Sequence, residues 1–251
     1  MARQEQAQEQ ALNELISTLE GFQDKTDFYT ILFYKSVGST NDVARELLQG
    51  GGNGDNPSYC NIVTHSPCTV VIADHQSGGR GRFQRQWFSP PGVNIYMSII
   101  IRDEMALALT DVSLINVVSS LAAIQAIKQC TTLEVSPQWP NDLYIRNKKI
   151  GGILSESVSM GERVISCITG IGINVNMTRE EVPQYLQQRA TSLLMETGLT
   201  YNRAQLICHI LEAFRPLYER LINDHQGLVR QWSALNEMSN ETPTETNAAC
   251  R

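Results

Sequence analysis

Four strand-like segments follow one another closely along the chain, and their spacing constrains the fold more than any other feature. They occupy residues 132–136, 142–146, 149–158 and 163–175. Only short polar turns separate the last three, whereas parallel neighbours need crossover connections of roughly a dozen residues or more. We therefore expect these three segments to pair as antiparallel neighbours in one sheet.

Further strands and helices are predicted on both sides of this group. Short apolar runs indicate strands, and apolar residues at helical spacing indicate helices. The predicted strands are 30–34, 69–74 and 93–101, and the predicted helices are 43–48, 111–129 and 202–223. Pro216 should kink the last helix, because proline has no N–H to donate and its ring clashes with the preceding turn. The pattern predicts an α+β fold: a mixed, largely antiparallel sheet with helices packed on one side.

The remaining segments are expected to add little to the core. Residues 1–20 are predicted to form a loosely attached amphipathic helix, and the glycine-rich residues 50–57 a flexible loop. The composition of residues 236–251 is polar and indicates disorder. We therefore divide the chain into an N-terminal extension (1–28), a single domain (29–235) and a disordered tail (236–251).

Composition argues against several classes of protein. The formal net charge of -6 disfavours general nucleic-acid binding, and no apolar run approaches the roughly 20 residues that cross a bilayer. The six cysteines and four histidines show no metal-ligand spacing, so structural zinc is not expected. Scattered cysteines and a polar N-terminus unlike a signal peptide favour a reducing compartment, and we expect the cytoplasm.

Residues 79–87 (Gly-Arg-Gly-Arg-Phe-Gln-Arg-Gln-Trp) carry the strongest chemical signal. Glycines let the backbone approach a ligand closely, and arginines offer forked donors to phosphate or carboxylate groups. The tryptophan at the end could cover a base or an apolar ring. The alternative is a solvated basic turn.

Four other motifs are candidates for ligand binding, and three of them also have a structural interpretation. Residues 39–41 (Ser-Thr-Asn) fit either a helix N-cap or a set of donors facing a polar ligand. Residues 139–142 (Trp-Pro-Asn-Asp) fit either an Asx turn or a site for a metal-bound phosphate. Residues 149–154 (Lys-Ile-Gly-Gly-Ile-Leu) place a lysine beside glycines that clear space for a ligand. Residues 170–174 (Gly-Ile-Gly-Ile-Asn) form either a close-packed strand or one that ends on a base-binding amide.

The order of these motifs, with Gln76 just before the arginine segment, resembles the biotin protein ligases over residues 29–232. The resemblance implies a catalytic domain with the class II synthetase-like fold. It implies a biotin–[carboxylase] ligase that uses ATP and Mg²⁺ to activate biotin as biotinyl-5′-AMP. The biotin would then pass to a lysine of a biotin carrier domain in carboxylases such as acetyl-CoA carboxylase.

The resemblance also assigns roles to single residues. Lys149 and Arg82 are implied to be catalytic, and Asp142 is implied to approach the magnesium ion. Biotin-binding roles fall on Ser39, Thr40, Asn41, Gln76, Gly79, Arg80, Gly81, Arg82, Lys149 and Gly151. Nucleotide-binding roles fall on Arg85, Trp87, Asn141, Asp142 and Asn174.

The sequence departs from the family's pattern at several points. Gln84 stands where the arginine loop usually has a small residue, and Gln138 replaces a basic residue before the Trp-Pro-Asn-Asp motif. No strands that could form the family's C-terminal β-barrel are predicted after Trp232, and no helix-turn-helix segment is predicted before residue 29. We therefore expect no DNA binding.

These departures keep two alternatives open. The first is a catalytically impaired, truncated protein that binds biotin or the carrier domain. The second is a lipoate or octanoyl ligase, because such enzymes are implied to share the fold. The sequence predicts no membrane association, and it leaves a homodimer open because an edge strand could pair across a two-fold axis.

Overall fold

In the computed structural model of the protein, residues 2–49, 66–102, 112–160 and 163–240 are described. The expected flexible loop at 50–57 lies outside these residues, as does the end of the predicted tail.

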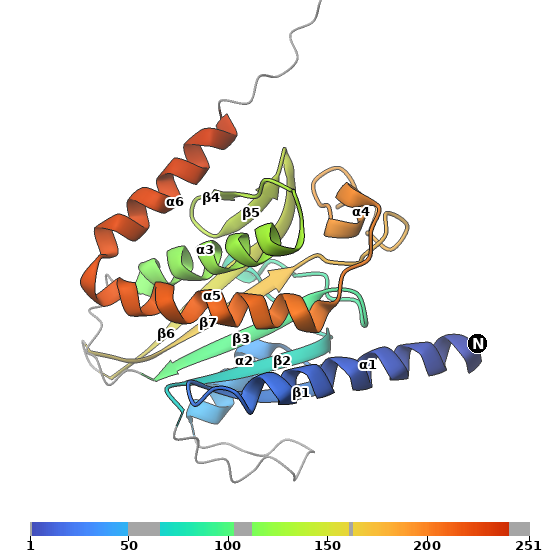
Figure 1. The fold of residues 1–251 in the computed structure, drawn as a ribbon, viewed down its shortest axis with the longest axis horizontal. Helices are drawn as coiled ribbons and strands as arrows, with labels where there is room; N and C mark the ends of the chain where they lie inside the picture. Colours follow the sequence, from blue (N-terminus) through green and yellow to red (C-terminus); the bar gives the residue numbers. More distant parts are fainter. Residues whose placement is uncertain (1, 50–65, 103–111, 161–162, 241–251) are drawn as a thin grey trace, which may run out of the picture.

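The described strands form one seven-stranded sheet in the order β1-β2-β3-β7-β6-β5-β4 (Figure 1). They are β1 (Tyr29–Val37), β2 (Cys68–Gln76), β3 (Ile95–Arg102), β4 (Ser136–Gln138), β5 (Asp142–Ile145), β6 (Lys148–Met160) and β7 (Arg163–Ile173). β1 and β2 are parallel, and every other neighbouring pair is antiparallel. The expected mixed, largely antiparallel sheet is confirmed.

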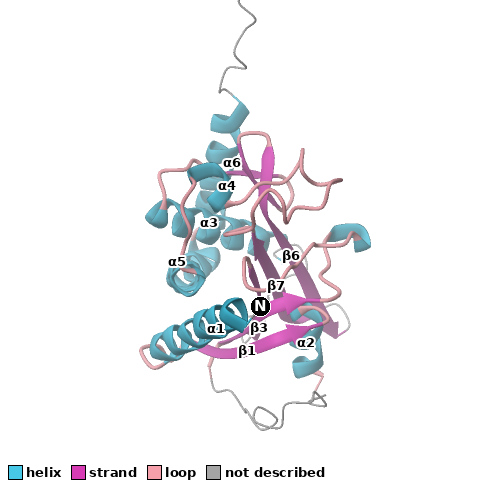
Figure 2. Cartoon of the chain, turned by 90° about the vertical axis from the view of Figure 1, so that its right-hand side faces the viewer, coloured by secondary structure: helices cyan, strands magenta, loops and turns pink. Residues whose placement is uncertain are grey.

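The described helices divide between the two faces of the sheet. They are α1 (Ala2–Gln23), α2 (Thr40–Leu48), α3 (Val112–Cys130), α4 (Leu193–Thr197), α5 (Arg203–Asn223) and α6 (His225–Asn240). Figures 1 and 2 show α1, α3 and α5 on one face and α2 on the other. The expectation of helices on one side therefore holds for α1, α3 and α5 and fails for α2.

The main core lies between the sheet and the helices α3 and α5, which cover one of its faces. Strand residues alternate between the two faces, so Ile171 and Ile173 of β7 enter this core while Gly170 and Gly172 face α2. α3 lies between α5 and strands β6 and β7, and Ala122 is buried there along with its larger apolar residues. This position explains why α3 is apolar on more than one face.

Three expectations, one about the attachment of α1 and two about the ends of elements, were wrong. α1 is not loosely attached, because Leu15 and Leu19 are buried in the main core. The strand expected at 132–136 begins only at Ser136. α6 continues to Asn240, so the disorder expected from residue 236 onward does not begin there.

α5 is one continuous helix that includes Pro216. Its buried residues recur at helical spacing on both sides of the proline, for example Leu211 and Leu221. The apolar stripe therefore packs against the core along the whole helix, as its periodicity predicts.

Candidate active site

A cleft of about 520 Å³ opens on the α2 face of the sheet. The structure brings together there most of the residues that the sequence analysis selected. Those that line the cleft are Ser39, Thr40, Asn41, Gln76, Arg80, Gly81, Arg82, Arg85, Trp87, Asn141, Asp142, Lys149 and Asn174. Two others lie behind its wall: Gly79 is buried against Ser89 and the Trp87 carbonyl, and Gly151 packs against Ile173.

The floor of the cleft is made of glycines from two paired strands. Gly152 of β6 pairs with Gly172 of β7, and Leu154 pairs with Gly170. A Cβ atom at Gly172 would lie 2.8 Å from Cε2 of Trp87, and one at Gly170 would overlap Oδ1 of Asn41. The glycines therefore let the indole ring and the asparagine amide approach the sheet backbone closely.

Lys149 lines the cleft from the start of β6. Its Nζ is 2.7 Å from Oδ1 of Asp142 and 5.2 Å from the centroid of the Trp87 ring. The Lys149 backbone N–H donates to the Arg189 carbonyl at 2.8 Å, and its carbonyl accepts from the N–H of Thr191 at 2.9 Å. The lysine is therefore a backbone-anchored cation held between a carboxylate and an aromatic ring.

The Ser-Thr-Asn motif lies at the start of α2. Ser39 is the N-cap residue, but its side chain makes no capping hydrogen bond. Oε1 of Gln76 accepts from the Thr40 backbone N–H at 2.9 Å and from its hydroxyl at 3.2 Å. Ser98 Oγ lies 2.7 Å from Thr40 Oγ1 and 2.6 Å from Asn41 Oδ1, and its single proton can be donated to either oxygen. Gln76 and Ser98 thus fix this end of α2 against the sheet.

Two buried asparagines stabilise the opposite wall. Asn141 Nδ2 donates to the Ile153 carbonyl at 2.7 Å, and Asn174 Nδ2 donates to the Thr191 carbonyl at 2.9 Å. Both bonds connect segments that lie apart in the sequence. The side-chain amides therefore have a structural role in addition to the nucleotide-binding role that the resemblance implies.

The loop of residues 79–87 closes on itself beside the cleft. Its backbone pairs Gly81 N–H with the Arg85 carbonyl at 2.7 Å and Trp87 N–H with the Gly79 carbonyl at 2.8 Å. Phe83 and Gln84 have φ angles of 56° and 57°, in the left-handed region that favours glycine. Gln84, one of the family departures, therefore occupies a position whose backbone suits a smaller residue.

The arginines of this loop differ in their surroundings. Arg80 forms ion pairs with Asp42 and Glu156. Arg82 and Arg85 are exposed, and neither forms an ion pair with a described residue. The cations that the loop has available for an anionic ligand are thus Arg82 and Arg85.

Two residues that sequence reasoning missed also line the cleft. Exposed Arg189 belongs to an irregular segment that runs beside Lys149, and no motif or periodicity marks it in the sequence. Tyr144 faces the cleft from β5, where burial and then the Asp142 carboxylate raise its pKa.

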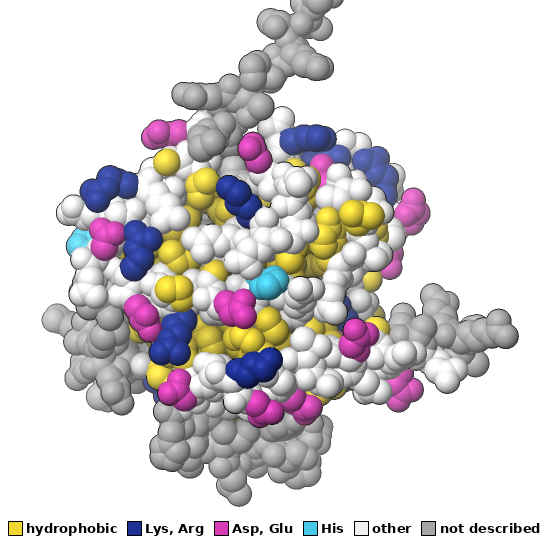
Figure 3. All heavy atoms as spheres, viewed as in Figure 1, with side chains coloured by type: hydrophobic (Ala, Val, Ile, Leu, Met, Phe, Trp, Pro, Cys, Tyr) yellow, Lys and Arg dark blue, Asp and Glu magenta, His cyan; other side chains and the backbone are white. Residues whose placement is uncertain are grey.

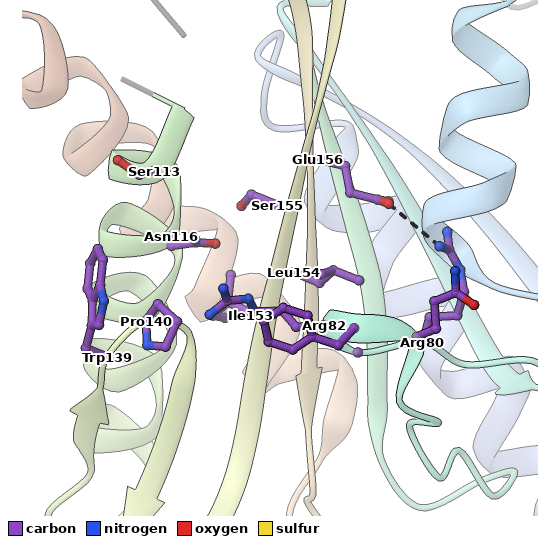
Figure 4. A pocket seen from close by; sticks show the side chains of 13 residues that line it. Arg80, Arg82, Ser113, Asn116, Trp139, Pro140, Ile153, Leu154, Ser155 and Glu156 are labelled. Carbon is purple, nitrogen blue, oxygen red and sulfur yellow. Dashed lines mark ion pairs between the residues drawn. The ribbon is translucent and has the colours of Figure 1, made fainter. Parts of the chain in front are cut away.

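A second hollow, of about 500 Å³, adjoins the cleft along β6 (Figure 4). The Arg82–Gln84 turn, Trp139 and the first residues of α3 contribute to its walls. Oδ1 of Asn116 is buried without a hydrogen-bond partner, and Trp139 packs edge-on against Trp232 at 5.9 Å between ring centroids. Gln138, the other family departure, lines neither cavity.

The described residues contain no cluster of metal-ligating side chains. None of their His, Cys, Asp and Glu side chains gather in a group of three or more that could hold a metal ion. Asp142 is the single carboxylate among the described residues that line the cleft.

Figure 3 shows acidic and basic side chains interspersed over the face viewed. Among the described helices, none is long and apolar enough to span a membrane.

The fold is that of a biotin protein ligase catalytic domain. The chain superimposes on the Aquifex aeolicus biotin protein ligase in complex with biotin and ATP with a TM-score of 0.64 and 26% identity, over 82% of this chain and 78% of that one. The Leishmania major biotin protein ligase in complex with biotinyl-5-AMP has the same fold, with a TM-score of 0.63 and 23% identity, over 88% and 87% of the two chains.

Sequence comparison leads to the same family. Residues 56–174 match the model of the Biotin/lipoate A/B protein ligase family. The bifunctional ligase/repressor BirA of Bacillus spizizenii is 36% identical over 188 residues, which are 75% of this chain and 53% of the relative. The chain thus spans about half the length of these curated relatives.

Proposed function

We propose that the protein is an ATP-dependent biotin ligase. It activates biotin as biotinyl-5′-AMP and transfers the biotinyl group to a lysine of a carrier domain, in carboxylases such as acetyl-CoA carboxylase. The observation that carries the proposal is the position of Lys149 between Asp142 and Trp87, over the glycine floor of a cleft bordered by two unpaired arginines. The biotin-bound and ATP-bound relatives of the same fold support it.

The first half-reaction brings two anions together. A carboxylate oxygen of biotin forms a bond to the α-phosphorus of ATP, and the bond to pyrophosphate breaks. Lys149, Arg82 and Arg85 supply positive charge that offsets the repulsion and stabilises negative charge on the phosphoryl oxygens. Asp142 and Trp87 hold the Lys149 ammonium within the cleft, where it can contact these oxygens.

The second half-reaction needs no nucleophile from the enzyme. The amine of the carrier lysine bonds to the carbonyl carbon of the adenylate, AMP leaves, and the amine loses a proton. Trp87 and the 79–87 loop border the cleft and would limit the access of water to the mixed anhydride.

Magnesium would be held mainly by the phosphates of ATP, since Mg²⁺ usually takes one or two protein carboxylates together with substrate oxygens. Asp142 is the carboxylate that fits this requirement. It would then interact with both the magnesium ion and Lys149, with which it forms an ion pair. The ion would supply charge neutralisation on the phosphates.

We also propose that the protein acts in the cytoplasm. The four cysteines among the described residues, Cys68, Cys130, Cys167 and Cys208, are all free. Free thiols are typical of a reducing compartment.

Exchange of labelled pyrophosphate into ATP tests the activation step without a carrier domain. The proposal predicts that exchange depends on biotin and that its rate does not exceed the background rate when lipoate replaces biotin. Exchange with lipoate alone would instead support the lipoate or octanoyl ligase. Biotin binding by calorimetry without any exchange would support the catalytically impaired binding protein.

A further inference from the structure

Arg80 belongs to a closed ring of four charged side chains beside the cleft. Arg45 lies 3.1 Å from Asp42 and 2.8 Å from Glu156. Arg80 is paired with the same Asp42 Oδ1 and lies 3.7 Å from the same Glu156 oxygen. Two cations and two anions therefore alternate around the ring, and Figure 4 shows the Arg80–Glu156 pair.

The ring connects three parts of the fold. Asp42 and Arg45 belong to α2, Glu156 to β6, and Arg80 to the 79–87 loop. The second oxygen of Glu156 accepts from Asn41 Nδ2 at 2.7 Å, which also orients an amide in the Ser-Thr-Asn motif. Glu156 thus contacts both the loop and the start of α2.

This arrangement gives Arg80 a role different from that of Arg82 and Arg85. Its guanidinium is shared between two carboxylates, and its Nε is buried without a partner. The ring also carries no net charge, so it adds little attraction for an anion. What it provides is an attachment point for a loop whose other arginines are exposed.

We infer that Glu156 and Asp42 are positioning residues that hold Arg80, and with it the 79–87 loop, in its closed arrangement beside the cleft. Contacts that favour the closed loop reduce the entropic cost that ligand binding has to overcome, which lowers the KM without changing the chemical step. The kinetic part of this inference rests on the proposed biotin ligase function.

Trypsin tests the attachment independently of any activity, because it cleaves after Arg82 and Arg85 in the exposed part of the loop. Glu156→Gln keeps the size of the side chain and an oxygen for Asn41, but it removes the charge that attracts Arg80. Without substrates, we expect cleavage at these two sites to be about threefold to tenfold faster, as for the loss of a partly exposed ionic network. Asp42→Asn should act in the same direction.

Glu219→Gln is the matched control, because it removes the same charge from an ion pair on α5, where Glu219 lies 3.0 Å from Arg215. Its loop should be cleaved at the wild-type rate. Wild-type cleavage rates in both Glu156→Gln and Asp42→Asn would overturn the inference. So would equal acceleration in the Glu219→Gln control.

Steady-state kinetics test the functional consequence. For Glu156→Gln we expect the KM for biotin to rise about threefold to tenfold while kcat changes less than about twofold. Added salt should raise the wild-type KM by screening the ring and should have less effect on the variant. An unchanged KM, or a fall in kcat that parallels a fall in Tm, would contradict a positioning role. If the wild type shows no biotin-dependent exchange, the proposed function fails, while the trypsin result still decides whether the ring holds the loop.

Discussion

At the scale of single residues, the chemistry centres on Lys149. Its ammonium is neutralised locally by Asp142 and lies over the electron-rich face of Trp87. The ion pair and the ring contact together orient the Lys149 side chain above the glycine-lined strands. A phosphate or carboxylate that enters the cleft can then take over the contact made by Asp142.

Lys149→Met removes this cation and keeps most of the volume of the side chain. The predicted result is a loss of biotin-dependent pyrophosphate exchange of about a hundredfold or more, because one fixed charge at a developing oxyanion is worth about that much. Lys148→Met is the control, since Lys148 precedes it on the same strand and does not line the cleft. Similar activity in the two variants would remove Lys149 from the catalytic machinery.

Gln84 is one of three described residues other than glycine that have a positive φ. At a φ of 57°, replacing it with glycine removes steric strain, whereas glycine at Gln86, whose φ is not positive, only adds freedom to the unfolded chain. We expect Gln84→Gly to be more stable than Gln86→Gly by about 1 kcal/mol, or about 2–4 °C in Tm. Equal melting temperatures would show that the left-handed backbone stores no strain.

At the scale of elements, the paired strands β6 and β7 build the floor of the cleft. In β7 the glycines alternate with core isoleucines, so one face of the strand packs the core while the other accepts Trp87 and Asn41. This alternation is visible in the sequence, which explains why the predicted segments at 149–158 and 163–175 lie close to the observed strands.

Long-range contacts limited the rest of the prediction from sequence. Arg189 reaches the cleft because its segment pairs with Lys149, and Arg80 is engaged by partners on α2 and β6. Neither contact leaves a local pattern. α1 was expected to be loosely attached because its first half is rich in Gln and Glu. The apolar stripe that includes Leu15 and Leu19 is visible in the sequence, but only the folded core shows that these two residues are buried.

Gly172→Ala tests whether close approach of Trp87 to the sheet matters. The new Cβ would lie 2.8 Å from the indole, so the ring must move away. We predict a changed tryptophan fluorescence spectrum and a fall in kcat/KM for exchange of about tenfold to a hundredfold. Gly21→Ala is the control, because a Cβ there meets nothing within 4 Å. Unchanged fluorescence and activity in Gly172→Ala would show that the floor tolerates a side chain.

At the scale of the whole molecule, the core contains thiols that resist ionisation. Burial raises the pKa of Cys68 and of Cys167 to about 12 and that of Cys208 to about 11. In the unfolded chain these thiols ionise near their ordinary value of 9.0. Between these values the unfolded state binds fewer protons, so the stabilisation that is complete below pH 9 is lost as the pH rises.

Stability should therefore fall above pH 9, with each deeply buried thiol contributing up to about 1.4 kcal/mol per pH unit. Urea unfolding between pH 8 and about pH 10.5 measures this slope, and Cys68→Ala should reduce it. Val70→Ala, a buried substitution on the same strand, should lower stability by a similar amount at every pH. Identical slopes for Cys68→Ala and the wild type would contradict the account.

The central claim is that this cleft activates biotin and passes it to a carrier domain. The most direct test incubates the purified protein with biotin, MgATP and a biotin carrier domain, and measures the intact mass of the carrier. The account predicts a carrier heavier by one biotinyl group, attached to a lysine and dependent on both biotin and ATP. A carrier that stays unmodified while the protein binds biotin would contradict it.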